Sequence, residues 1–277
     1  MDKDNIFKSC NFYLDDGDVV HVLIKDFVGD NLSISLNDND GTQEDDTEIT
    51  PYGELYTGKY GALYNWFAAT DLRNICASGW RVTTHSDWET LALYLQPGAT
   101  TLANTVGGLL KEVGFTYWNN PNTGATNSVN FNARGVGYRS GITGTYWNIG
   151  NTAYFMNTDE WPPQPAISVM GTYIRYDSDL FYTSIGANEW NGSGKTNGSA
   201  IRLIKNSTSL LDGETGIYTG NDGRVYNTIC IGTQEWLSQN LAETKFRNGE
   251  DIPVIEDIDA WAALITAGMC YYDNVEV

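Results

Sequence analysis

The chain has 277 residues, of which 41% are hydrophobic and 18% are charged, a composition typical of globular rather than disordered proteins. Its net charge of −19 and sequence pI of about 4.2 argue against general binding to the phosphate backbone of nucleic acids. The 29 glycines and 17 tyrosines, against only 4 methionines, favour a loop-rich fold with strands over a helical bundle.

The first fifth of the chain is acidic and predicts β structure. Residues 1–50 hold 13 acidic residues and 3 lysines, which is a net charge of −10. Residues 1–36 contain the aliphatic runs and alternations of half-buried strands. The acidic run 37–46 fits a solvated linker better than a calcium loop, because Leu36 and Thr47 would stand at ligand positions. We therefore predict a small β-rich N-terminal module over 1–50 and a domain boundary after it.

The first residues contain no apolar run, so we expect no export signal there. Either the protein is used without the general secretion route, which the initiating Met1 favours, or a signal was removed. No stretch approaches the roughly 20 apolar residues of a membrane-spanning helix, so we expect no membrane insertion.

Apolar residues recur at helical spacing in three places, which predicts amphipathic helices at 60–67, 88–95 and 261–265. Ser86 and Glu89 form a capping box before the second, and Asp257 precedes the third. We interpret all three apolar stripes as faces packed on the core.

From about residue 114 to 200 the helical spacing disappears. Short aromatic segments alternate there with Gly, Asn, Ser and Thr, as in GYR at 137–139 and TYWN at 145–148. This pattern is typical of long ordered loops carried on a few strands.

Several segments together resemble the Fibrobacter succinogenes major paralogous domain family: YGALYNW at 60–66, GWRV at 79–82, DWETL at 87–91, LKE at 110–112, WNNPNTGATN at 118–127 and GYR at 137–139. The family looks like a branch of the C-type-lectin-like and formylglycine-generating-enzyme-like fold, and the resemblance implies that fold here. The fold class we expect is therefore α+β.

The order of the parts differs from the family. Members usually open with segments like DGRVY at 222–226, IGTQEWL at 231–237 and CYYDN at 270–274, which here follow the rest. The resemblance thus covers about four-fifths of the chain and implies a circularly permuted lectin-like domain over 51–277. Residues 216–277 would supply the part that normally comes first.

The late segment 216–277 has two possible positions. It completes either its own chain, which the short linker 206–216 favours, or a neighbouring chain. We also expect a homo-oligomer, because the arrangement suits multimeric display.

The cysteines are scattered, have no CxxC spacing and lie far from His21 and His85: Cys10, Cys76, Cys230 and Cys270. We expect no zinc or other metal site, and the thiols either form one or two disulfides or stay unpaired and buried. The family often has a cysteine where this chain has Leu203. Cys76 then lacks the partner that the resemblance implies, which fits a reducing compartment.

Catalytic signatures are missing, since the chain has no GxSxG, HExxH or phosphate-loop motif. Enzymes that share the resembled fold use a cysteine pair for copper and oxygen, and this chain has no cysteine from Val113 to Arg224. We expect no enzyme activity and no cofactor.

Recognition fits the sequence better. Tyr and Trp offer large rigid contact areas and can stack on sugar rings, while Asn, Ser and Gly add hydrogen bonds. The other interpretation is that these aromatic rings form core, although Trp147, Trp161 and Trp190 have loop-forming neighbours. The candidate ligand-binding residues are Tyr138, Arg139, Tyr146, Trp147, Asn148, Tyr154, Trp161, Tyr176, Asp177, Tyr182 and Trp190.

Related loop regions in other lectin-like proteins vary to change ligand, and similar domains occur in surface and bacteriophage structural proteins. The resemblance therefore implies a bacteriophage fibre, tail or capsid-decorating adhesin in the virion. Its N-terminal module would dock on virion structural proteins, and its other partner would be a host-surface glycan or protein. The alternatives are an assembly protein of the virion without ligand, or an extracellular or bacterial cell-surface binding protein.

Overall fold

The computed structural model describes residues 9–13, 19–23, 49–50, 53–54, 58–100, 103–161, 165–185 and 194–276. Sheets with a few short helices make up these residues, so the predicted α+β class is correct. In the N-terminal part, β1 (Ser9–Tyr13) pairs antiparallel with β2 (Val19–Leu23), and β3 (Ile49–Thr50) pairs with β4 (Gly53–Glu54). The acidic run 37–46 lies outside the described residues.

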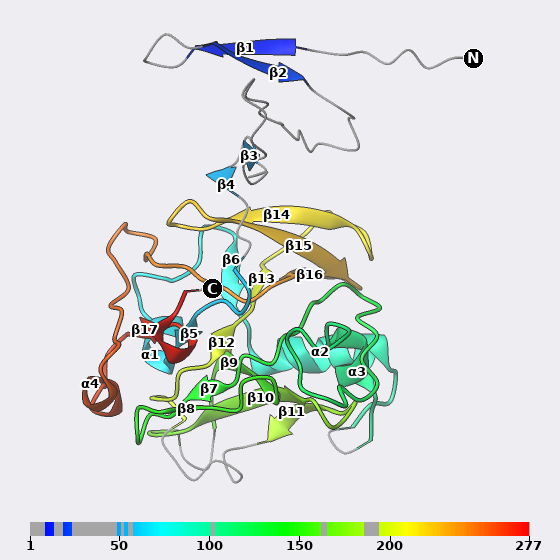
Figure 1. Cartoon of the computed structure of the whole chain (residues 1–277). Coiled ribbons are helices and arrows are strands. Elements are labelled where there is room, and N and C mark those ends of the chain that lie inside the picture. The colour runs from blue at the N-terminus through cyan, green and yellow to red at the C-terminus, as the bar shows by residue number, and fades with distance from the viewer. Residues whose placement is uncertain are drawn as a thin grey trace.

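One sheet joins two distant parts of the chain. Its five strands lie in the order β14 (Thr215–Thr219), β15 (Val225–Ile231), β16 (Gln234–Leu237), β13 (Leu203–Lys205) and β6 (Trp80–Val82), all antiparallel (Figure 1). Gly232, with φ of +64°, makes the tight turn from β15 to β16 that a side chain would strain. The sheet is therefore complete only when the late segment pairs with β13.

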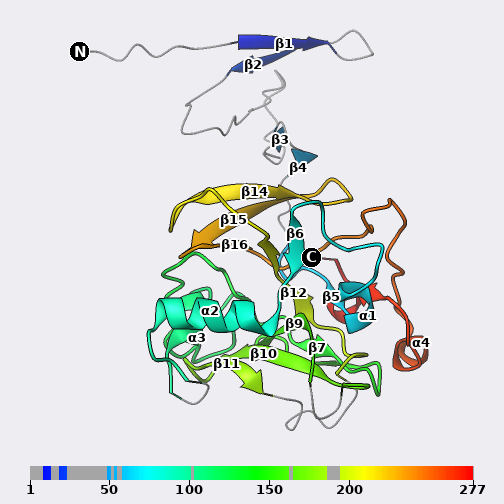
Figure 2. The same ribbon diagram turned by 180° about the vertical axis from the view of Figure 1, so that it is seen from behind.

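The second sheet has the order β11 (Phe181–Ile185), β10 (Val169–Arg175), β9 (Thr152–Glu160) and β12 (Ala200–Ile201). The first three form an antiparallel meander, and β12 is parallel to β9. A short hairpin of β7 (Tyr138–Arg139) and β8 (Tyr146–Trp147) continues it through a bridge between Gly137 and Ala153. Figures 1 and 2 show this sheet on the opposite side of the helices from β14–β16.

The predicted helix at 60–67 is wrong. Leu63 and Tyr64 form β5 (Leu63–Tyr64), which pairs with β17 (Met269–Cys270), so both lie in a strand. The helix α1 (Trp66–Ala69) begins only after Asn65, whose Oδ1 accepts the Ala68 N–H at 3.0 Å. Pairing with residues two hundred positions away overrides the local spacing.

The second predicted helix is confirmed as α2 (His85–Leu95), but its cap lies two residues earlier than expected. Thr84 and Asp87 form the capping box, and Asp87 also pairs with Arg81. The third is confirmed only in part as α4 (Ile258–Ala262), with Asp257 accepting the Ala260 N–H at 2.7 Å. Trp261 is buried as predicted, but Leu264 and Ile265 follow the helix, and Ile265 is 76% exposed.

Two short elements were not predicted. The helix α3 (Val106–Leu110) contains two glycines because it packs close to the backbone of Leu180 and Gly124. A 3₁₀ turn, η2 (Tyr272–Asn274), follows β17.

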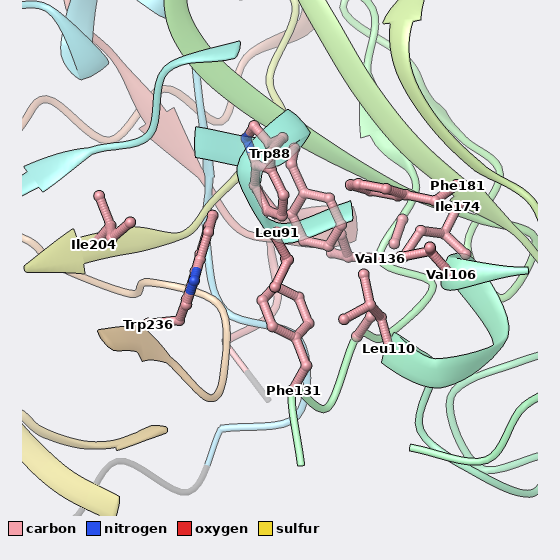
Figure 3. Close-up of a cluster of buried hydrophobic side chains, with 14 of the residues drawn as sticks. Trp88, Leu91, Val106, Leu110, Phe131, Val136, Ile174, Phe181, Ile204 and Trp236 are labelled. Carbon is pink, nitrogen blue, oxygen red and sulfur yellow. The ribbon is translucent and has the colours of Figure 1, made fainter. Parts of the chain in front are cut away.

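Trp88 lies at the centre of the main core (Figure 3). Its ring stacks on Phe155 at 5.0 Å and lies 4.7 Å from the ring of Trp236, while its Nε1 donates to the Thr83 hydroxyl at 3.0 Å. Phe155 comes from β9 and Trp236 from β16, so the two sheets and α2 meet in this one cluster. Removing the late segment would open the core.

The described cysteines Cys76, Cys230 and Cys270 are buried and unpaired. Burial raises the pKa of the Cys76 thiol to about 12, so it stays protonated at neutral pH. Within the described ranges, no three His, Cys, Asp or Glu side chains are placed to share a metal ion. None of the described helices has the length and apolar character needed to cross a bilayer.

Glu243 is a buried carboxyl group that orders the loops around the late segment. It accepts backbone N–H groups of Asn221 at 2.5 Å, Asp222 at 2.9 Å and Lys245 at 3.1 Å. Burial, and next the charge of Asp222, raise the pKa of Glu243 to about 7. Because this folded-state pKa lies above the unfolded value near 4.5, the folded chain binds the extra proton between these two pH values.

Stability should therefore rise as pH falls from 7 to 4.5. The Glu243 contribution is fully present below pH 4.5 and is lost as pH rises through 7, which amounts to about 3 kcal/mol. Urea unfolding at both pH values measures it, with Glu243→Gln as the non-titrating reference. We expect the gain on acidification to be about 3 kcal/mol larger in the wild type, and equal gains would contradict the assignment.

Candidate ligand-binding surface

The β7–β8 hairpin is held from below by Arg139, which is completely buried. Its guanidinium donates to the carbonyl oxygens of Gly144 at 2.8 Å, Glu256 at 2.8 Å and Asp257 at 3.1 Å, and also to that of Ile255. Predicted as a ligand contact, Arg139 instead ties the hairpin to the segment before α4. It is a positioning residue, and it does not reach the surface.

Five aromatic rings lie side by side on the face of the second sheet opposite the main core. We call this set the aromatic row: Trp147, Tyr138, Tyr154, Tyr173 and Tyr182. Tyr138 stands opposite Trp147 in the hairpin. The ring centroids of Tyr138 and Tyr154 are 5.2 Å apart, those of Tyr154 and Tyr173 5.6 Å, and those of Tyr173 and Tyr182 4.4 Å.

Strand alternation places these rings on one face. In β9, Ala153 and Phe155 point into the core, so Tyr154 between them points outward. Ile174 and Phe181 likewise face the core, which turns their neighbours Tyr173 and Tyr182 outward. The row therefore crosses β8, β7, β9, β10 and β11 in order.

Trp147 is the exposed end of the row, with 52% of its surface accessible, whereas Tyr173 is only 6% exposed. The Trp147 Nε1 donates to the Thr145 hydroxyl at 2.8 Å, which orients the indole. Asn148 beside it is exposed at a φ of +66°, and its amide nitrogen lies 3.4 Å from the Tyr154 hydroxyl. This end offers a flat ring with a polar amide next to it.

Tyr146 links the hairpin to the end of the chain. Its hydroxyl donates to Asn274 Oδ1 at 2.5 Å, and its ring centroid lies 5.0 Å from that of Tyr272. Burial, and next the nearby Cys270, raise the pKa of Tyr146, so it remains a neutral phenol. The late segment thus borders the exposed end of the row.

The other predicted residues lie apart from this end. Tyr176 packs against the main core, and exposed Asp177 pairs with Arg175 at 2.7 Å, which lowers the Asp177 pKa. Trp161 is half-buried directly after β9, where its backbone N–H donates to the Ser168 carbonyl oxygen at 3.0 Å. Trp190 falls outside the described residues.

The sequence interpretation missed Tyr173, which connects Tyr154 to Tyr182 in the row. The alternation of outward and inward side chains around Ile174 was the signal that could have identified it. It also missed Asn274, because nothing local indicates that the chain end reaches Tyr146.

The chain also matches the sequence model of the family that its motifs resemble. Residues 27–205, more than half of the chain, match the Fibrobacter succinogenes major domain (Fib_succ_major). No curated protein and no solved structure matches the chain. This chain therefore belongs to the Fibrobacter succinogenes major domain family.

Proposed function

We propose that this chain is a non-enzymatic recognition protein that binds a host-surface glycan or protein through the exposed end of the aromatic row. The observation that carries the proposal is Trp147, a half-exposed indole at the end of a row of rings fixed on a sheet. Rigid aromatic groups lose little entropy on binding, and sugar C–H faces stack on them. Exposed Asn148 adds an amide that can pair with a ligand hydroxyl group.

The domain that carries this surface is, in our proposal, a C-type-lectin-like domain in circularly permuted order. The contact between β17 and β5 supports it, because Cys270 pairs with Leu63. The segment CYYDN at 270–274 thus ends beside YGALYNW at 60–66, which follows it in the usual family order. A permutation keeps such former neighbours together in space.

The setting we propose is a bacteriophage virion, as a fibre, tail or capsid-decorating protein. The N-terminal module would dock on virion proteins, and the lectin-like domain would face outward as part of a homo-oligomer. Mass spectrometry and antibody labelling of purified virions test this setting. We expect the protein in intact particles, and its absence from them would contradict the virion assignment.

Binding to bacterial cells and capsular polysaccharides tests the recognition role. We expect labelled protein to bind selectively, and Trp147→Ala to reduce binding at least about tenfold, because a central aromatic contact typically contributes 1.4 kcal/mol or more. Leu211→Ala is the matched control, since Leu211 is 70% exposed at a site distant in sequence from the row. Equal binding by both folded variants and the wild type would remove Trp147 from the site.

A second candidate function is assembly of the virion without a ligand. Ile142 and Ile258 are 57% and 50% exposed, and Ile258 lies against Gly144 in the hairpin. Apolar side chains so placed suit a contact between subunits. If this is the role, Trp147→Ala and Ile258→Asn should block assembly while no cell surface is bound. A third candidate is an extracellular or bacterial cell-surface binding protein, which an export signal upstream in the reading frame would favour.

A further inference from the structure

A pocket opens on the face of the second sheet opposite the main core, between Tyr154 of the aromatic row and a second buried cluster that includes Met156 and Val169. The pocket is small and open to solvent. Tyr154 and Met156 line it from β9, Val169 and Gly171 from β10, and Asn197 and Ser199 from the segment that enters β12. The pocket is distinct from the exposed end of the row at Trp147.

The pocket follows from the strand register. Gly171 stands opposite Met156 and adds no side chain to the pocket wall. The register shifts between Val169 and Gly171, which bends the strand at this point. Ala200 faces the core, so Ser199 before it faces outward on the same side as Met156.

The lining is mostly apolar, and its polar residues are Tyr154, Thr172, Asn197 and Ser199. The Ser199 hydroxyl makes no hydrogen bond to any residue that the structure describes, although only 6% of the residue is exposed. Asn197 accepts the Gly141 N–H at 2.8 Å through Oδ1, which leaves its NH₂ group as a donor. The pocket thus combines apolar side chains with a hydroxyl group and an amide group.

The absence of charged side chains from the described pocket lining favours a neutral ligand. No Lys or Arg side chain is among its lining residues, and the nearby Lys195 is already paired with Glu160. The chain carries a net charge of −19, which disfavours an anionic sugar. A long acyl chain would leave the polar wall of Ser199 and Asn197 without partners.

We infer that this pocket receives the acetamido group of a neutral N-acetylated amino sugar. The methyl group would pack on Met156 and Val169, and the acetamido oxygen would accept from Ser199 or Asn197. The sugar ring would then lie toward Tyr154 and the aromatic row. The inference rests on the proposed recognition function and names the class of ligand for it.

Saturation-transfer NMR with free sugars tests the inference on the full chain. The probes are N-acetylglucosamine and N-acetylgalactosamine, with glucose and glucosamine as controls. We expect the strongest transfer at the acetyl methyl protons, and binding about tenfold weaker without the acetyl group, because a buried methyl and one hydrogen bond are lost.

Two variants locate the site. Gly194→Val should abolish the transfer, because a Cβ at Gly194 lies 3.3 Å from the Val169 nitrogen at the pocket wall. Ser199→Ala removes only the hydroxyl and should weaken binding about three- to tenfold with an unchanged melting temperature. Equal transfer to glucose and to the acetylated sugars, or transfer that neither folded variant changes, would overturn the inference.

The same sugars as competitors in the cell-binding assay separate the two proposals. Inhibition by N-acetylated sugars alone would support both. Cell binding that depends on Trp147 but resists these competitors would contradict this ligand class and leave the recognition function standing. Loss of the Trp147 dependence itself would count against the recognition function.

Discussion

A chain that ends after Asn206 should fail to fold. It would lack β14, β15, β16 and β17, and with β16 the fully buried Trp236 beside Trp88. Removing a large core side chain alone typically costs 3–5 kcal/mol, which approaches the whole stability of many domains. We expect the truncated chain to lose its near-ultraviolet circular dichroism and its cooperative thermal transition.

Removal of residues 1–50, the predicted N-terminal module, is the matched control, and we expect the cooperative transition to persist there. Adding residues 207–277 as a separate chain to the truncated form should restore part of the signal, because the segment pairs with β13 and β5 by non-covalent contacts. A truncated chain that unfolds cooperatively on its own would show that the late segment is not part of the core.

Arg202→Met should destabilise the fold by about 3–5 kcal/mol. The buried guanidinium donates to the carbonyl oxygens of Phe131 at 2.8 Å, Leu237 at 2.7 Å and Asn132 at 2.9 Å, and lies over the Phe131 ring. A methionine fills part of the volume but leaves these carbonyl groups unpaired in a dry interior. Arg202 connects loop 127–135 with the late segment, so both should loosen together when it is replaced.

Chemical denaturation measures this effect, and Arg175→Met is the control. Arg175 is exposed and pairs with exposed Asp177, so its loss should change the free energy of unfolding by less than about 1 kcal/mol. Equal stability of Arg202→Met and the wild type would mean that the orphaned carbonyl groups find water or other partners.

The fold was predictable where local patterns act alone. The apolar spacing of Trp88 and Leu91 and the cap at Asp257 identified α2 and α4, because these signals lie within a few residues of each helix. The helix at 60–67 failed, since Tyr64 pairs with Met269 and with Ser199, partners that no local pattern reveals. Long-range pairing was decisive wherever the late segment enters.

The site was predictable to the same extent. Loop-forming neighbours identified Trp147 as exposed and Asn148 as its companion. The same reasoning could not show that Arg139 is buried and not a ligand contact, because the carbonyl groups that it binds belong to residues 255–257. Composition indicates an aromatic surface, while only the register shows which rings share a face.

The second sheet packs on both faces. Phe155 and Ile174 join the main core, while Met156 and Val169 on the other face join a second buried cluster beside the aromatic row. A rigid sheet therefore carries both the exposed ring of Trp147 and the pocket beside Tyr154. Such preorganisation reduces the entropy lost on binding.

Hydroxyl-radical footprinting of the protein bound to a recognised bacterial strain tests the central claim most directly. Trp147 and Ile149, which are 52% and 37% exposed, should be protected from oxidation on binding. Leu72 and Leu211, which are 102% and 70% exposed, should be oxidised as in the unbound protein. Protection of Leu72 or Leu211 with Trp147 unchanged would place the binding surface elsewhere and contradict the account.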